Sequence, residues 1–455
     1  MNEPHTVFEE SRRNVAGIDI AGTADHYVCG PRKEDGTHDT THFGTMTSEL
    51  HRLLAWLRER KVESVALEST SVYWIPVADL LEANGIEVVL VDTREVRMVP
   101  GRKSDVKDCQ WIQKLHSCGL LHAAFRPPES IVAVRTLLRE KENLIATRTQ
   151  FIQQMQKSCD QMNIRIHHAV TDIDGATGMA IVAAIIGGER DPRALAKLRD
   201  RRCKKTEAQI AEELRGTWRE EHLFNLAQAY GMLVSVDGVI ARYEEKISSM
   251  YRRIAENFPR EPSLRPPPEG EGPTARAKRL RDAEGKKDIA RIMGSDMTMI
   301  SGIAYGTAAI VVSELGWDFA RFPNERHFAS YIGLAPSLGK SAGKNVRQKR
   351  RHRNTHRVGK ALCMAAATLH RSDTELGAFF RAVARRSDRK TAVKATARRM
   401  AHKIYRAVRH GVEYVEKGAH AYEERIRVKT LKTVKHLINS LGISELELST
   451  MLKTV

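Results

Sequence analysis

The chain has 455 residues, of which 42% are hydrophobic and 29% are charged. This composition excludes a disordered polyelectrolyte and a membrane protein, and the length predicts two or three domains. Lysine and arginine total 74 against 56 acidic residues, which gives a formal net charge of +18 and an isoelectric point near 9.7. A positive field of this size attracts polyanions, so nucleic acid is the expected partner.

The sequence predicts a cytosolic protein. Its N-terminus has no apolar stretch typical of a signal peptide, and no apolar run approaches the ~20 residues that cross a bilayer. A membrane surface is the weaker alternative, since no basic amphipathic helix with aromatic anchors stands out. The six cysteines, at positions 29, 109, 118, 159, 203 and 363, show no pairing pattern and are predicted to be free thiols.

Strands and helices alternate over residues 1–125, which predicts an α/β domain with a mixed sheet. A helix with leucines at 3–4 spacing is expected around residues 50–57, and a second one ends near Asn84. The expected strands are short apolar runs, and the first two would form a hairpin. They span residues 14–21, 26–30, 64–69 and 86–92.

Residues 126–257 show the periodicity of a long helical coiled coil. Eleven positions follow a 3–4 spacing, and nine of them are apolar. They are Ile131, Val134, Leu138, Lys141, Ile145, Arg148, Ile152, Met155, Cys159, Met162 and Ile166. A weaker seam from Leu226 to Ile254 is broken by Asp237 and Glu244. An antiparallel helical pair is expected, within one chain or between subunits, with Lys141 and Arg148 limiting its stability and fixing its register.

Residues 258–285 are rich in proline, glycine and charge, and they predict a linker. A C-terminal all-α domain is expected over 286–410, and a helical tail over 411–455. Residues 296–316 predict two short helices joined by a glycine turn at 301–303. Such an element either offers backbone N–H groups to a phosphate or serves helix packing alone.

Four acidic residues of the first domain occupy unusual places. Asp19 lies inside an apolar strand, Glu68 ends another, and Asp105 and Asp108 have the i,i+3 spacing of one helix face. A buried carboxylate is costly without a partner. A pair of Mg²⁺ ions bound by these oxygens would supply that partner and would clamp a phosphodiester. Each acid alone also fits a turn, a helix cap or a match to the helix dipole.

A dense basic segment follows in the C-terminal domain. Residues 326–372 contain eleven lysines and arginines and no acidic residue. Phosphate is the natural counter-charge for such a run, although a solvated basic face has the same composition. Nine cations are candidate nucleic-acid ligands: Lys340, Lys344, Arg347, Lys349, Arg350, Arg351, Arg353, Arg357 and Lys360.

The segment Gly339-Lys340-Ser341 is not a Walker A loop. Five residues separate Gly333 from Gly339, where that motif needs four, and no apolar strand directly precedes Gly339. The sequence therefore argues against an ATPase.

These motifs resemble those of one family. GIDIA, LES and GRKSDVKDCQW resemble the N-terminal DEDD domain, of RNase H-like (RuvC-like) fold, in transposases of the insertion-sequence one-ten family and in the related Piv-type DNA invertases. The resemblance implies that Asp19, Glu68, Asp105 and Asp108 form a catalytic tetrad that binds Mg²⁺, with Mn²⁺ as an alternative. GLAP followed by Ser-x-Gly-Lys resembles the serine transposase domain of the same family, and it implies that Ser341 is the nucleophile.

A serine that attacks a phosphodiester forms a covalent phosphoserine, which preserves the bond energy for rejoining. Gly343 would let the DNA backbone approach, and Lys340 and Lys344 would stabilise developing phosphate charge. Ser337 is the nearest competing serine, and a turn serine is the bland alternative for Ser341. The basic run after the serine is richer in histidine and arginine than in compact family members. The segment 188–198 looks like sequence inserted in longer members.

Cys109, His116, Cys118 and His122 cluster after the tetrad, but their spacing matches no common zinc module. We interpret them as packing residues.

The resemblance implies a site-specific DNA recombinase or transposase that acts on donor and target DNA at the bacterial nucleoid. Both catalytic parts would form a composite site in a dimer or tetramer, and family members of the transposase type use a structured non-coding bridge RNA as guide. Three alternatives stay open. The first is a metal-dependent junction nuclease that uses the tetrad alone, the second is an invertase without guide RNA, and the third is a non-catalytic architectural protein.

Overall fold

The computed structural model describes residues 10–68, 72–91, 105–121, 123–262, 264, 276, 280, 282–335, 338–341, 344–347, 356–411 and 418–441. The side chains of Asp105, of residues 338–341 and 344–347, and of Ala419 are outside this description. The chain forms two compact units, Met1–Arg126 and Pro127–Val455.

The N-terminal unit contains a five-stranded mixed sheet with the strand order β3-β2-β1-β4-β5. Strands β1 to β3 form an antiparallel meander, and β4 and β5 extend the sheet in parallel from β1. Their bounds are Val15–Asp19, His26–Arg32, His38–Phe43, Ser64–Glu68 and Glu87–Val91. The predicted mixed sheet is confirmed, and β3 is a further strand that the sequence pattern did not indicate.

Helices cover both faces of this sheet. One face packs against α1 (Thr47–Glu59) and α2 (Trp74–Ala83) through a core of apolar strand and helix residues. The other face carries α4 (Asp105–Ser117), and Ala66 and Ile112 belong to the small core between them. This two-sided arrangement agrees with an α/β nuclease-like domain.

Gly17 allows α4 to lie directly on β1. A Cβ atom at position 17 would overlap the backbone of Gln113 and would lie 2.5 Å from the carbonyl oxygen of Cys109. A larger residue at position 17 would therefore push the helix away from the sheet.

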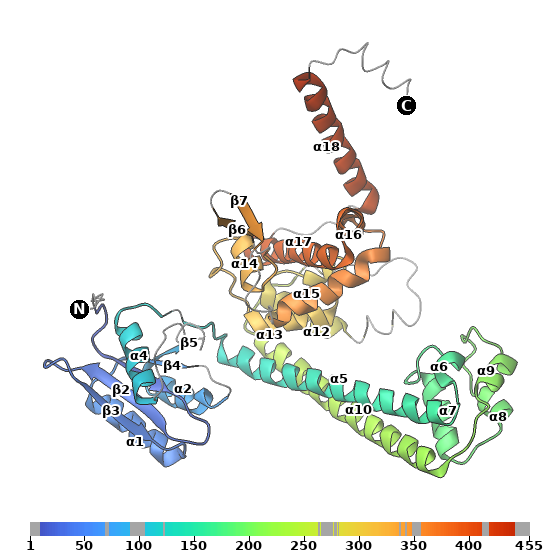
Figure 1. Ribbon diagram of the computed structural model, residues 1–455, viewed down its shortest axis with the longest axis horizontal. Coiled ribbons are helices and arrows are strands. Elements are labelled where there is room, and N and C mark those ends of the chain that lie inside the picture. Colours follow the sequence, from blue (N-terminus) through green and yellow to red (C-terminus); the bar gives the residue numbers. More distant parts are fainter. Residues whose placement is uncertain are drawn as a thin grey trace. The chain divides into compact units, whose positions relative to one another are not determined.

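Two long helices, α5 (Glu129–Gln161) and α10 (Glu220–Ala255), run antiparallel in the C-terminal unit (Figure 1). The charged positions of the two seams meet each other. Lys141 Nζ lies 3.3 Å from Glu244, and Arg148 Nε lies 2.6 Å from Asp237. The two seams therefore pair within one chain. Each basic residue that interrupts the first seam forms an ion pair with an acidic residue that interrupts the second.

The connection between α5 and α10 folds into a small helical tip with its own apolar core. It contains α6 (Ile166–Ala169), α7 (Ala176–Ile186), α8 (Pro192–Ala196) and α9 (Glu207–Glu213). The segment 188–198, which looked like an insertion, lies in this tip. Arg148 also bonds to Asp174 at 2.8 Å, which ties the tip to α5.

The remaining helices, apart from the last one, share one hydrophobic core with the bases of α5 and α10. In chain order they are α12 (Ala283–Met293), the 3-10 turn η1 (Met297–Met299), α13 (Tyr305–Leu315), α14 (Glu325–Tyr331), α15 (Arg357–Ala367), η2 (Thr368–Arg371), α16 (Glu375–Arg386), α17 (Arg389–His410) and α18 (Gly418–Ser440). Helix α18 packs on α16 through a small separate cluster that contains Tyr422 and Ala378. The region is helical, as predicted, except for a two-stranded hairpin of β6 (Leu338–Ser341) and β7 (Lys344–Arg347).

The segment 296–316 begins with a shorter helical element than the sequence predicts. The first of the two short helices expected over 296–316 is only the η1 turn, which Asp296 caps by accepting from the N–H of Thr298. Gly302 then adopts a φ of 87°, which permits the predicted glycine turn before α13.

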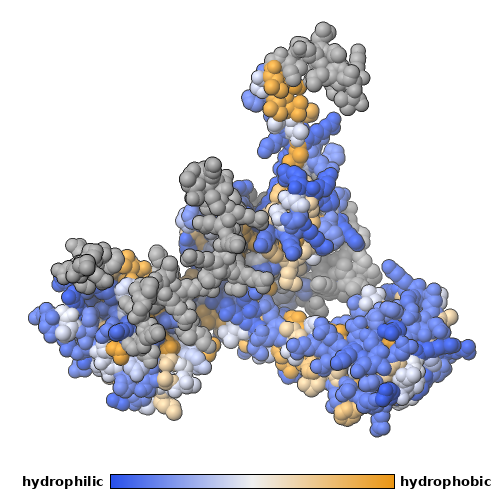
Figure 2. Space-filling model, viewed as in Figure 1, coloured by the Kyte–Doolittle hydropathy of each residue, from blue (hydrophilic) through white to orange (hydrophobic). Residues whose placement is uncertain are grey.

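Helix α18 exposes apolar side chains along much of its length, as the hydropathy colouring shows (Figure 2). They are Ile426, Val428, Leu431, Val434 and Leu437, and Leu441 directly after the helix is exposed as well. Within the described chain, α10 alone is long and apolar enough to span a membrane. Some of its apolar residues belong to the two hydrophobic cores that it shares with α5.

Candidate active site

Two acidic residues end neighbouring parallel strands. Asp19 is the last residue of β1, and Glu68 is the last residue of β4. The strands pair in register up to Ile18 opposite Leu67, so the two acids directly follow that pair. Side chains alternate across a strand, and Ile18 and Leu67 face the core under α1 and α2. Asp19 and Glu68 therefore belong to the opposite face, which α4 covers.

The direction of α4 brings its first turn to the same edge of the sheet. Near the end of the helix, His116 Nε2 lies 2.9 Å from Ser64 Oγ at the start of β4. Midway along the helix, the backbone of Cys109 passes Gly17. The helix thus starts beside the carboxyl ends of the strands, and its first residue, Asp105, lies at the edge that carries the two acids.

Asp108 lies one turn into α4 and is half-buried. Positions 105, 108 and 112 share one helix face by their spacing, and Ile112 is fully buried against the sheet. The structure therefore brings Asp19, Glu68 and the first turn of α4 to one edge of the sheet.

The pKa of Cys109 reflects the proximity of the Asp19 carboxylate to α4. Burial, together with the neighbouring Cys29 thiol and the Asp19 carboxylate, raises the pKa of the Cys109 thiol to about 12. Burial likewise raises the pKa of Cys29 to about 11. Both thiols are protonated at neutral pH, so they are packing groups next to the acids rather than nucleophiles.

The donor set at this edge fits a hard divalent cation. Carboxylate oxygens from two strand ends and a helix turn are the ligands that Mg²⁺ and Mn²⁺ prefer. Among the described side chains, no three from histidine, cysteine, aspartate and glutamate are close enough to hold a metal ion. The carboxylate of Asp105 is outside that description.

Cys109 and His116 are buried packing residues, as expected. The Cys109 thiol donates to the carbonyl of Val106 at 3.1 Å, and His116 is buried beside Ser64. Burial lowers the pKa of His116 to about 4, so the ring is neutral at physiological pH. His122 is outside the described residues.

The candidate nucleophile lies at the end of a hairpin strand. Ser341 is the last residue of β6 and pairs with Lys344, the first residue of β7. Lys340 pairs with Asn345 one step further along the hairpin. The backbone thus places Ser341, Lys340 and Lys344 next to one another where β6 and β7 pair. Gly343 is outside the described residues.

The predicted cations after Ser341 fall into three groups. Arg347 ends β7 opposite Leu338. Arg357, at the start of α15, pairs with Glu142 and Glu314, and Lys360 is exposed one turn later. The other predicted ligands, Lys349, Arg350, Arg351 and Arg353, are outside the described residues. Arg357 is therefore committed to internal ion pairs, which the sequence does not reveal.

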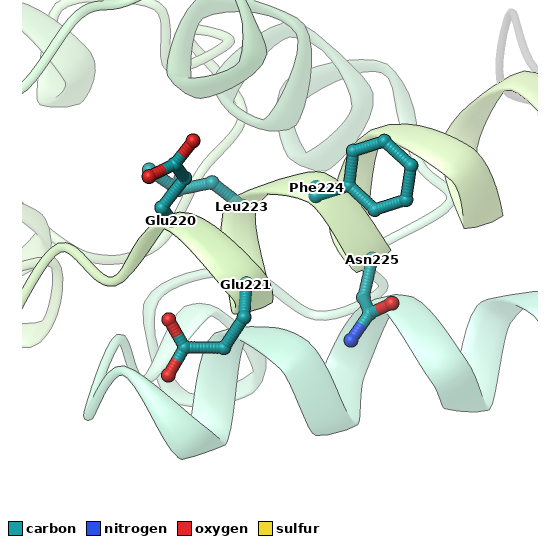
Figure 3. Close-up of a pocket in the computed structure, with 5 residues that line it drawn as sticks. All are labelled: Glu220, Glu221, Leu223, Phe224 and Asn225. Carbon is teal, nitrogen blue, oxygen red and sulfur yellow. The ribbon is translucent and has the colours of Figure 1, made fainter.

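A shallow pocket near the tip has acidic side chains in its lining, unlike the basic segment that carries Ser341. It lies at the first turn of α10 and is lined by Glu220, Glu221, Leu223, Phe224 and Asn225 (Figure 3). Its two carboxylates would repel phosphate, so this pocket is not a nucleic-acid site.

Comparison with known families matches both regions that carry the candidate residues. Residues 16–164 match the DEDD transposase model of the IS110 family, and residues 295–381 match the transposase model of the IS116/IS110/IS902 family. The chain belongs to the IS110 family of transposases. No curated protein matches it significantly.

Membership makes the chain a DNA transposase of an insertion element, an enzyme whose substrates are DNA. A DEDD transposase domain implies dependence on a divalent metal ion. The first match spans the sheet, α4 and α5, and the second spans η1 to α16. The tip helices α6 to α9 and helices α10, α12, α17 and α18 lie outside both matched regions.

Two residues with close structural contacts, Gly17 and Glu314, gave little signal in the sequence. Gly17 is one glycine among thirty, and only the contact with α4 shows its importance. In the sequence, Glu314 reads as an ordinary surface acid at the end of an apolar helix. In the structure its side chain is buried among three arginines. An acidic residue in an otherwise apolar helix segment was the one available hint.

Proposed function

We propose that this transposase recombines DNA at specific sites through a phosphoserine intermediate at Ser341, with divalent metal ions bound by Asp19, Glu68, Asp105 and Asp108. The observation that supports the tetrad is the common edge of Asp19, Glu68 and the first turn of α4. The pairing of Ser341 with Lys344 at the hairpin turn supports the serine.

The metal ions, when bound, would polarise the scissile phosphate. The four carboxylates would hold them. Ser341 Oγ attacks phosphorus, forms a new P–O bond and gives up its proton, while the bond to the leaving strand breaks and that oxygen gains a proton. Lys340 and Lys344 would stabilise the charge on the non-bridging oxygens. Attack by a hydroxyl of the other strand reverses this step, releases Ser341 and reseals the DNA without hydrolysis.

The partners belong to the same proposal. Donor and target DNA would meet in a dimer or tetramer, since two sites must be held together. A structured bridge RNA encoded by the element would select the sites, and the reaction would take place in the cytoplasm, at the nucleoid.

A denaturing gel tests the chemistry. Purified protein is incubated with Mg²⁺ and end-labelled donor and target DNA, with and without RNA transcribed from the region that flanks its gene. Wild type should give a covalent protein–DNA adduct, and Ser341→Ala should give none. Ser337→Ala, at the nearest competing serine, is the matched control and should keep the adduct.

The metal requirement is read in the same assay. Chelation with EDTA and the variant Asp108→Asn should each abolish the adduct, and added Mg²⁺ or Mn²⁺ should restore it only after chelation. Nicked DNA without an adduct, unaffected by Ser341→Ala, would contradict the serine mechanism and identify a nuclease that uses the tetrad alone. Dependence of the adduct on the RNA would establish the guided reaction.

A further inference from the structure

The side chain of Glu314, near the end of α13, is only 7% exposed and meets three arginines. Arg139 Nε and Nη2 donate to its two carboxylate oxygens at 3.0 and 2.8 Å. Arg135 Nε lies 3.5 Å from one of these oxygens, and Arg357 Nε lies 3.3 Å from the other. Because a buried carboxylate is stable only with such partners, this cluster holds its members in one arrangement.

The three arginines come from two different parts of the unit. Arg135 and Arg139 lie on α5, and Arg135 also donates to the backbone carbonyls of Ser313 and Glu314 at 3.0 and 2.8 Å. Arg357 opens α15 and pairs as well with Glu142 of α5. Glu314 therefore joins the base of the long helix α5 to the first residue of α15.

The first turn of α15 in turn holds the segment that leads into β6. A Cβ atom at Gly359 would overlap the carbonyl oxygen of Ile332, so the two backbones are in direct contact. The ring centroids of Tyr331 and His356 lie 5.2 Å apart across the same junction. Leu334, buried in the shared core, also lies against Gly359. Both ends of the segment that carries Ser341 are thus fixed to one another beside Arg357.

We propose that Glu314 is a positioning residue for the serine hairpin, and that it couples the placement of Ser341 to helix α5. This inference rests on the proposed role of Ser341. Loss of the carboxylate leaves Arg357 with Glu142 alone and frees the first turn of α15 to shift against Ile332. Ser341 then loses its placement for attack, while the charges of the other predicted nucleic-acid ligands are unchanged. A displacement of about 1 Å at a reacting group costs on the order of a hundredfold in rate.

The chain offers a matched control at Glu375, the first residue of α16. Its side chain is 5% exposed and also meets three cations, with Arg425 at 2.7 Å, Arg399 at 2.9 Å and Lys403 at 3.8 Å. These contacts join α16 to α17 and α18 and do not involve the ends of the serine segment. Glu375→Gln thus removes a buried charge of the same kind without the proposed positioning effect.

The test compares Glu314→Gln and Glu375→Gln in the full-length protein. Three quantities are measured: the thermal unfolding midpoint, the dissociation constant for donor DNA, and the rate of covalent adduct formation at saturating DNA. Both variants should lose similar thermal stability and keep the wild-type dissociation constant. Only Glu314→Gln should slow adduct formation, by about tenfold to a hundredfold. Equal rates in the two variants, or a rate loss explained by weaker binding, would overturn the proposal.

A milder variant covers the case in which Glu314→Gln does not fold. Arg139 is 47% exposed and donates two bonds to Glu314, so Arg139→Gln weakens the cluster without burying a new group. It should slow the adduct step with unchanged DNA binding, and a wild-type rate would overturn the proposal. Ser341→Ala is run in parallel: an adduct that persists in that variant shows that the proposed nucleophile is wrong, whatever Glu314 does.

Discussion

Gly17 and His116 determine how closely α4 can approach the sheet. Gly17 leaves room for the helix backbone, and His116 anchors the far end of the helix to Ser64 on β4. Because the first turn of α4 carries two of the four predicted metal ligands, these residues would position the proposed tetrad without contributing an oxygen to it. A substitution at either position would act on catalysis through the position of the helix.

The buried His116 makes the stability of the N-terminal unit depend on pH. Burial, helped by nearby Arg12, lowers its pKa to about 4, against about 6.5 in the unfolded chain. Between these values the unfolded chain binds a proton that the folded chain does not. The free energy of unfolding should therefore have its full value above pH 6.5, and it should be about 3 kcal/mol lower at pH 4.

Hydrogen exchange of peptides from β1 and β4, followed between pH 4 and 7, measures this loss after correction for the intrinsic exchange rate. His116→Gln should remove most of the pH dependence, whereas His410→Gln, at an exposed residue of α17, should leave it as in wild type. A pH dependence unchanged by His116→Gln would contradict the assignment.

At the scale of elements, hydrophobic periodicity predicted local secondary structure. The apolar runs gave four of the five strands, and the 3–4 spacing gave both long helices, because burial against a partner requires those patterns. Strand β3, with the sequence HDTTHF, has only one fully buried residue and hence no apolar signal. The hairpin of β6 and β7 is short and polar, so composition alone did not separate it from a loop.

The candidate acids were predictable because their positions at strand and helix ends follow from local sequence. The direction of α4 and the burial of Glu314 depend on contacts between residues far apart in the chain. No single segment carries such information. Arg357 shows the same limit, since its neighbours in sequence indicate a nucleic-acid ligand and its contacts in space show an internal ion pair.

The ion pairs between α5 and α10 should contribute measurably to stability. Arg148 and Asp237 are partly buried and 2.6 Å apart, so a double-mutant cycle with Arg148→Ala and Asp237→Ala should give a coupling of about 1 kcal/mol. Urea unfolding measures it. The exposed pair Arg219 and Glu221, at 2.8 Å, is the control and should couple by only a few tenths of that value. Equal couplings would show that burial adds nothing to the central pair.

At the scale of the whole molecule, the charge of +18 is unevenly spread. The segment 326–372 has no acidic residue, whereas the long helices and the tip alternate both signs. Electrostatic attraction to nucleic acid is thus expected to concentrate in the C-terminal half of the sequence, next to Ser341.

This charge distribution predicts a steep salt dependence of DNA binding. Seven cations from Lys344 to Lys360 are available once Arg357 is excluded, so log K against log salt should have a slope of about −6. Fluorescence anisotropy between 50 and 200 mM salt measures it. Replacing Lys349, Arg350 and Arg351 by glutamine should reduce the slope by about 3. The same change at Arg193, Arg201 and Lys204 of the tip should leave it unaltered, and equal effects of the two triple variants would contradict a localised surface.

The antiparallel pairing of α5 and α10 restricts how this protein can change in evolution. Lys141 and Arg148 are seven residues apart, and so are their partners Asp237 and Glu244. Inserting residues into one helix alone would shift the register of every later contact between the helices. A cation would then lie opposite an apolar side chain. Viable relatives of different length should therefore gain or lose residues in both helices together, in multiples of seven. Unmatched changes in length would be confined to the tip, where the chain turns back.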